Sequence, residues 1–106
     1  MSESIAVRLE HRQPTMDGVL TFDGEVVEIF GFNDVHSVRL PLGLIEGAKV
    51  SFDKGLIAQP NITFPGRGGG MGYTQAIEPP DEQRPELENF AARVTAAAAR
   101  TGGSLT

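Results

Sequence analysis

The sequence predicts a mainly β domain of the α+β class, in which about seven antiparallel strands are closed by one C-terminal helix. Three observations lead to this prediction. Short apolar stretches separated by glycine, asparagine and proline fill the chain up to Pro79-Pro80. Beyond that pair, apolar side chains recur at helical spacing. The sequence contains no second helical pattern of similar length, so the helix is expected to complete a core formed by the strands.

The first half of the chain shows the clearest strand signals. Ile5, Val7 and Leu9 alternate with small or charged residues, which predicts a half-buried strand over 4–10. Asp23-Gly24 then lies between two runs of β-branched and aromatic residues, 19–22 and 26–30. This pattern predicts a hairpin with a type I′ turn, whose two central residues both have positive φ.

Further strands are expected over 35–40, 48–52, 56–64 and 73–77, although Pro60 divides the third or marks a sheet edge. The segment 41–47 contains one proline and two glycines, and it predicts an irregular or helical turn that buries Leu42 and Ile45. The glycine-rich segment 65–72 predicts a long flexible loop. Four aromatic residues are expected in the core: Phe22, Phe30, Phe52 and Phe64.

The C-terminal segment has the features of a single amphipathic helix. Pro85 suits the first turn, where its missing N–H is not needed. One apolar stripe follows, formed by Leu87, Phe90, Ala91, Val94 and Ala98. Gly102-Gly103 supplies a stop signal. We therefore expect one domain over 1–100 and a flexible tail over 101–106.

Composition and charge restrict the classes of partner. The formal net charge of −5 opposes non-specific binding to nucleic acid, so no nucleic-acid partner is expected. No apolar stretch approaches the roughly 20 residues of a membrane span, and the first ten residues lack the apolar core of a signal peptide. The absence of cysteine excludes disulfides and thiolate metal sites. It agrees with a cytoplasmic location, although exported domains also lack cysteine.

The glycine-rich loop is the first candidate binding site. Arg67, together with the backbone N–H groups of Gly68, Gly69 and Gly70, is a candidate for binding an anionic lipid or metabolite. Arg12, in the loop after the first strand, is a second candidate cation. A strand pattern follows the glycines where a nucleotide-binding loop would continue into a helix. A loop without a ligand is therefore the alternative interpretation.

The sequence gives little support to catalysis. His11 and His36 are the only histidines, and neither has a partner at metal-binding spacing. The chain has no nucleophile elbow, the motif that marks one large class of hydrolases. We therefore predict no catalytic residues, metal or cofactor.

A set of short motifs carries a resemblance to a known family. The motifs are Val19-Leu20-Thr21-Phe22-Asp23-Gly24 with Val27 and Ile29, Val38-Arg39-Leu40-Pro41-Leu42 with Ile45, Ile62-Thr63-Phe64-Pro65-Gly66, and Phe90. Their order resembles the pleckstrin-homology-like domains, in particular a bacterial family of such domains with unknown function. The resemblance covers about residues 17–100 and implies a partly open barrel with the helix at one end.

The resemblance also implies a non-enzymatic binding module. Its phosphoinositide-binding members carry lysines and arginines on the first hairpin, where this chain has Asp23, Glu25 and Glu28, so that activity is not carried over. We expect a domain that recruits a protein or peptide partner, through an exposed sheet edge, or that self-associates. Binding of an anionic lipid or metabolite at the glycine-rich loop is the alternative, and an enzyme of unknown class is the third.

Overall fold

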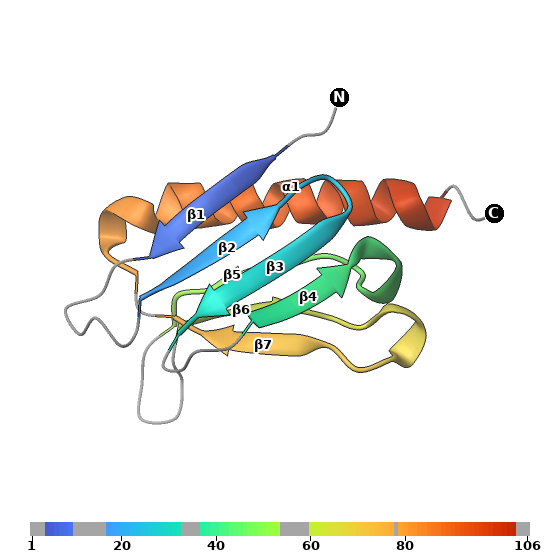
Figure 1. Cartoon of the computed structure of the whole chain (residues 1–106), viewed down its shortest axis with the longest axis horizontal. Helices are drawn as coiled ribbons and strands as arrows, with labels where there is room; N and C mark the ends of the chain where they lie inside the picture. Colours follow the sequence, from blue (N-terminus) through green and yellow to red (C-terminus); the bar gives the residue numbers. More distant parts are fainter. Residues whose placement is uncertain (1–3, 10–16, 33–36, 54–59, 78, 104–106) are drawn as a thin grey trace.

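The computed structural model describes residues 4–9, 17–32, 37–53, 60–77 and 79–103. In this part of the chain, seven strands form two antiparallel sheets, and one long helix follows them (Figure 1). The first sheet has the order β1-β2-β3-β4, with β1 Ile5–Leu9, β2 Gly18–Phe22, β3 Val26–Gly31 and β4 Ser37–Pro41. The second has the order β5-β6-β7, with β5 Lys49–Ser51, β6 Asn61–Phe64 and β7 Tyr73–Ala76.

This arrangement confirms the mainly β class, the seven antiparallel strands and the C-terminal helix. The described strands form no closed barrel. Outside the two sheets, an isolated bridge joins Ile45 to Gly66. A short helical turn, η2 Leu42–Leu44, follows β4 and buries Leu42, and Ile45 is buried directly after it. The turn expected over 41–47 is therefore confirmed, although Pro41 itself belongs to β4.

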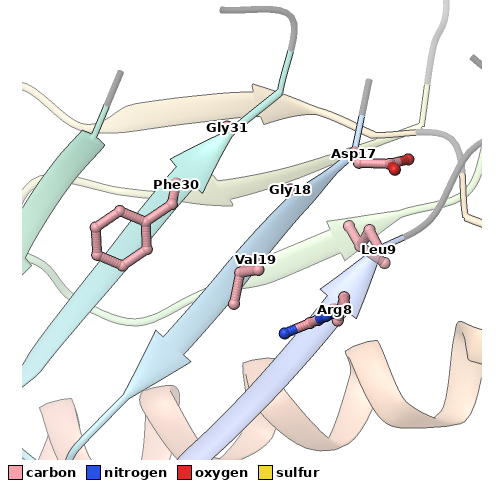
Figure 2. Close-up of a pocket in the computed structure, with 7 residues that line it drawn as sticks. All are labelled: Arg8, Leu9, Asp17, Gly18, Val19, Phe30 and Gly31. Atoms are coloured by element: carbon pink, nitrogen blue, oxygen red, sulfur yellow. The ribbon is translucent and has the colours of Figure 1, made fainter. Parts of the chain in front are cut away.

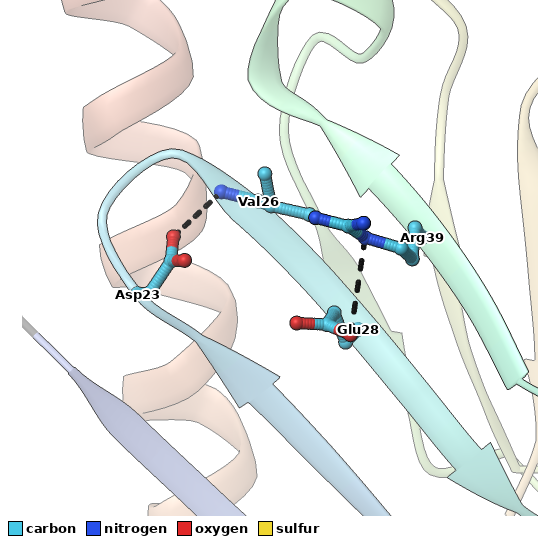
Figure 3. Close-up of polar contacts among 4 residues, drawn as sticks. All are labelled: Asp23, Val26, Glu28 and Arg39. Carbon is cyan, nitrogen blue, oxygen red and sulfur yellow. Dashed lines mark hydrogen bonds and ion pairs between the residues drawn. The ribbon is translucent and has the colours of Figure 1, made fainter.

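The hairpin between β2 and β3 is present, but the predicted turn type is wrong. Gly24 has a φ of 100°, whereas Asp23 is not in the positive-φ region. The Asp23 carboxylate instead accepts hydrogen bonds from the N–H groups of Glu25 and Val26, each at 2.9 Å. Figure 3 shows the bond from Val26. Asp23 pairs with Val26, so Gly24 and Glu25 are the two central residues of the turn, and only Gly24 has a positive φ. The Asp23 side chain closes this turn. These two hydrogen bonds hold the pKa of Asp23 below its usual value.

One hydrophobic cluster takes side chains from both sheets, from η2 and from the helix. In β3, Val27 and Ile29 are fully buried, and strand alternation therefore places Phe30 on the opposite, outer face. Phe30 is 40% exposed, so its predicted core position is wrong. Phe22 and Phe64 are buried as expected. Phe52 is half-buried against the cluster, with the Arg84 guanidinium 4.7 Å from its ring centre.

The helix α1 Arg84–Gly103 begins after a short turn, η4 Asp81–Gln83. Leu87, Phe90 and Val94 are fully buried, and α1 packs against β1, β5 and η2. The helix continues through Gly103 and so includes the first three residues of the expected tail, and the Thr101 hydroxyl donates to Ala97 O at 3.0 Å. None of the helices in the described ranges is long and apolar enough to cross a membrane.

Candidate binding pocket

A pocket of about 340 Å³ lies on the outer face of the first sheet, at the ends of β1, β2 and β3 (Figure 2). Strand register puts Arg8 opposite Val19, and Val19 opposite Phe30, so three side chains form one row across three strands. Gly18 and Gly31, which pair with each other, and Asp17 lie at the end of this row. The row offers a cation, an aliphatic group and an aromatic ring in sequence.

Two glycines line the hollow beside the row. Gly18 and Gly31 face each other on β2 and β3 and present only backbone to the pocket. A Cβ atom added to Gly18 would overlap the ring of Phe32, which packs against the inner side of this strand. Gly31 has a φ of 86°, a conformation that side-chain-bearing residues rarely adopt.

Phe32, directly after β3, has an unusual backbone conformation. Its φ of 65° is the only positive φ among the described non-glycine residues, and its side chain is 2% exposed. The Phe32 N–H donates to Asp17 O at 2.9 Å, which ties the end of β3 to the start of β2. A left-handed aromatic residue costs about 1–3 kcal/mol, and burial of its ring offsets this by about 1.5–3 kcal/mol. The pocket is therefore formed by backbone that the core holds in place.

Arg8 supplies the cation of the pocket. The residue is exposed, and its guanidinium has no hydrogen bond or ion pair with any residue in the described ranges. Its backbone carbonyl accepts a hydrogen bond of 2.7 Å from Gln83 Nε2, which fixes β1 to η4, the turn before α1. A guanidinium in this setting can bind a carboxylate or phosphate through a pair of parallel hydrogen bonds.

The glycine-rich loop lies at the opposite end of the molecule from this pocket (Figure 1). It contains a short turn, η3 Arg67–Gly69, within which Gly68 and Gly69 both have positive φ. The Arg67 guanidinium donates from one nitrogen, Nη2, to Leu42 O and to Ala98 O, each at 3.1 Å. Its Nε is buried and finds no hydrogen-bond partner among the described residues. Arg67 thus connects the loop to η2 and to α1.

At two other positions near this loop, backbone packs so closely that only glycine fits. A Cβ atom on Gly66 would overlap the carbonyl of Gly70, and one on Gly72 would overlap the carbonyl of Phe64. The structure therefore brings Arg67, Gly68, Gly69 and Gly70 together in a compact turn. Arg12, the other predicted site residue, lies outside the described residues. A ligand at this loop stays a prediction.

The residues of the pocket were not singled out from the sequence as a site. Arg8, Val19 and Phe30 lie on three strands, and only the pairing register brings them into one row. A signal was nevertheless present in β3. Val27, Ile29 and Phe30 cannot all face the core of a regular strand, because successive side chains point to opposite faces. The fully apolar pair Ile29-Phe30 therefore indicated one exposed apolar side chain.

The fold and the pocket together define a small two-sheet α+β domain whose larger sheet carries a pocket lined by apolar residues, by Arg8 and by Asp17. Comparison of the chain with known protein families and with characterised proteins finds no match. The type of ligand therefore has to follow from the chemistry of the pocket.

Proposed function

We propose that this protein is a non-enzymatic binding domain that recruits a protein or peptide partner through the pocket beside Phe30. The observation that carries the proposal is the exposure of this ring, 40% of which is open to solvent beside a hollow lined by Gly18 and Gly31. An exposed aromatic side chain next to a concave surface is typical of the residues that dominate protein interfaces.

Arg8 adds a requirement for negative charge in the partner. It lies two strands from Phe30, about 10 Å away at the usual strand spacing. A peptide segment with an apolar side chain over Val19 and Phe30 and a carboxylate at Arg8 matches this row. The interface would resemble others in which apolar contact supplies most of the affinity and a charge fixes the orientation.

We also propose that the two sheets and the helix have the pleckstrin-homology-like architecture. The chain order of four strands, then three strands, then one helix supports the resemblance. The contacts of Arg67 with two backbone carbonyls give no support to the alternative of an anionic ligand at the glycine-rich loop. That alternative and the enzyme class both stay predictions.

Selection from a random peptide library, followed by NMR mapping on the ¹⁵N-labelled protein, tests the proposal. We expect the selected peptides to share an acidic residue near an aromatic or aliphatic one. We also expect them to shift the amide signals of Arg8, Val19 and Phe30. The variant Phe30→Ala should weaken binding about 10-fold or more, and Arg8→Gln should weaken it and reduce its salt dependence.

Leu44→Ala is the matched control, because Leu44 is a second exposed apolar side chain, 62% exposed, at the other end of the molecule. It should leave the affinity unchanged. Peptides that bind with equal affinity to Phe30→Ala, or that shift signals only in α1 or the second sheet, would contradict the proposal.

A further inference from the structure

The two open sheets have four edge strands, β1, β4, β5 and β7. Exposed edges invite pairing with other chains, and proteins usually block them with side chains, charges or proline. The direction of the main-chain groups follows from the hydrogen bonds at the strand ends, because N–H and C=O groups alternate between the two sides of a strand.

Side chains from the C-terminal region block two of the edges. On β1, Gln83 Nε2 donates to the outward carbonyl of Arg8. Next to β5, the Thr95 hydroxyl accepts from the Ala48 N–H and donates to the Ala48 carbonyl, each at 3.0 Å. The turn η4 thus engages the β1 edge, and α1 engages the backbone next to β5.

The edge of β4 is protected by its own residues. The Leu42 N–H donates to Glu25 O at 2.9 Å, so Leu42 faces β3 and the alternate residues Ser37, Arg39 and Pro41 face outward. Pro41 has no N–H to offer, and Arg39 adds a charge, 69% of whose side chain is exposed. Proline and charge are two of the usual means of preventing edge pairing.

The β7 edge carries no charge and no proline, and a single side chain engages one of its outward carbonyls. Its Ile77 N–H donates to Pro60 O at 3.0 Å, so the main-chain groups of Thr74 and Ala76 face outward. The Ala76 carbonyl accepts from Gln75 Nε2, but the N–H and C=O of Thr74 have no hydrogen-bond partner in the described part of the chain. The segment 68–77 contains no charged residue and no proline.

From these observations we infer that β7 is the self-association surface of this protein, and that it pairs antiparallel with β7 of a second copy around Thr74. This inference concerns a different surface from the pocket and does not depend on the proposed function. In this register Thr74 lies opposite Thr74 of the second copy, and Tyr73 lies opposite Gln75. Threonine pairs and the Tyr–Gln pair are compatible across strands, and no like charges meet.

The neighbouring residues favour a second copy over an unrelated peptide. Peptides that add to a sheet edge are usually selected by pockets for alternate side chains, and the outward surface beside Thr74 consists of small neutral groups, chiefly Thr63 and Ala76.

Light scattering over a series of protein concentrations tests the association. The wild-type mass should rise towards that of a dimer, and Thr74→Lys should remain monomeric, because it places two like charges opposite each other. Ser37→Lys, the same change on the β4 edge, should dimerise like the wild type. Each copy has a net charge of −5, so dimerisation should strengthen as salt is added. A monomeric wild type, or equal dimerisation of Thr74→Lys, would overturn the inference.

Cysteine cross-linking tests the register, since the chain has no native cysteine. In the proposed pairing, residues 74 of the two copies form a hydrogen-bonded pair with Cα atoms about 5.5 Å apart, within the range for a disulfide. Thr74→Cys should form a disulfide-linked dimer at least 10-fold faster than Ser37→Cys. Equal rates for the two variants would show that β7 is not the pairing edge. Unchanged far-UV circular dichroism is required of every variant.

Discussion

The hydroxyl of Thr95 lies 3.0 Å from both the amide nitrogen and the carbonyl oxygen of Ala48. One side chain of α1 therefore takes the place of a neighbouring strand beside β5. Gly47 permits this approach, because a Cβ atom there would lie 2.9 Å from the Thr95 hydroxyl. The helix thus covers the core and also satisfies the backbone at the edge of the second sheet.

The change Thr95→Val should lower the free energy of unfolding by about 1–3 kcal/mol, because it removes both hydrogen bonds while keeping the shape of the side chain. Thr21→Val is the control, since Thr21 lies on the outer face of β2 and gains β propensity from the same change. Urea denaturation of both variants measures the difference. Equal stability of the two would mean that the Thr95 contacts contribute nothing net.

Replacement of Arg67 by methionine tests its structural role. The change keeps an aliphatic stem but removes the donors to Leu42 O and Ala98 O, so we expect a loss of about 1–3 kcal/mol in urea denaturation. Arg93→Met, on the exposed side of α1, should have little effect. Co-sedimentation with acidic vesicles tests the alternative of an anionic ligand. Salt-sensitive pelleting that is lost in Arg67→Ala would support that alternative.

The turn at Asp23 predicts a pH dependence of stability. Its folded-state pKa is lowered, chiefly by the hydrogen bonds from the Glu25 and Val26 N–H groups. The ionised carboxylate therefore stabilises the fold at pH values above the unfolded-state pKa, near 3.8. This stabilisation is lost as pH falls through the lower, folded-state pKa. NMR titration of the side-chain carbonyl carbon should show the shift directly, and Asp23→Ala should remove this contribution to acid unfolding.

Removal of the chain after Pro79 should unfold the strands. Leu87, Phe90 and Val94 are fully buried, and their burial contributes about 5–8 kcal/mol. The total stability of a domain of this size is of the same order, about 5–15 kcal/mol. The truncated chain should therefore lack the dispersed amide signals of a folded protein in NMR. A dispersed spectrum with native β-sheet shifts would show that the strands fold without the helix.

Much of the fold could be predicted from local patterns. Alternation in Ile5, Val7 and Leu9 identified β1, and the apolar stripe around Phe90 identified the helix. These patterns are reliable because each depends only on neighbours along the chain. The turn at Asp23 was harder, since Asp-Gly fits both a type I′ turn and a turn closed by the aspartate side chain.

The pocket and the function of Arg67 could not be predicted in the same way. The row Arg8–Val19–Phe30 depends on the register of three strands, and register is set by the packed core. The glycine-rich loop was predicted to be a flexible anion-binding site because it combines one arginine with several glycines. The contacts of Arg67 with Leu42 and Ala98 span 25 and 31 residues, and no local pattern reports them.

The backbone of Gly18 is all that lies between the pocket and the buried Phe32 ring. The pocket lies on one side of it, and the Phe32 ring fills the place of its missing side chain on the other. A larger residue at this position would displace Phe32, and fold and pocket would be lost together. A new binding preference can therefore evolve at Arg8, Asp17, Val19 and Phe30, whose side chains can change while the core behind them stays intact.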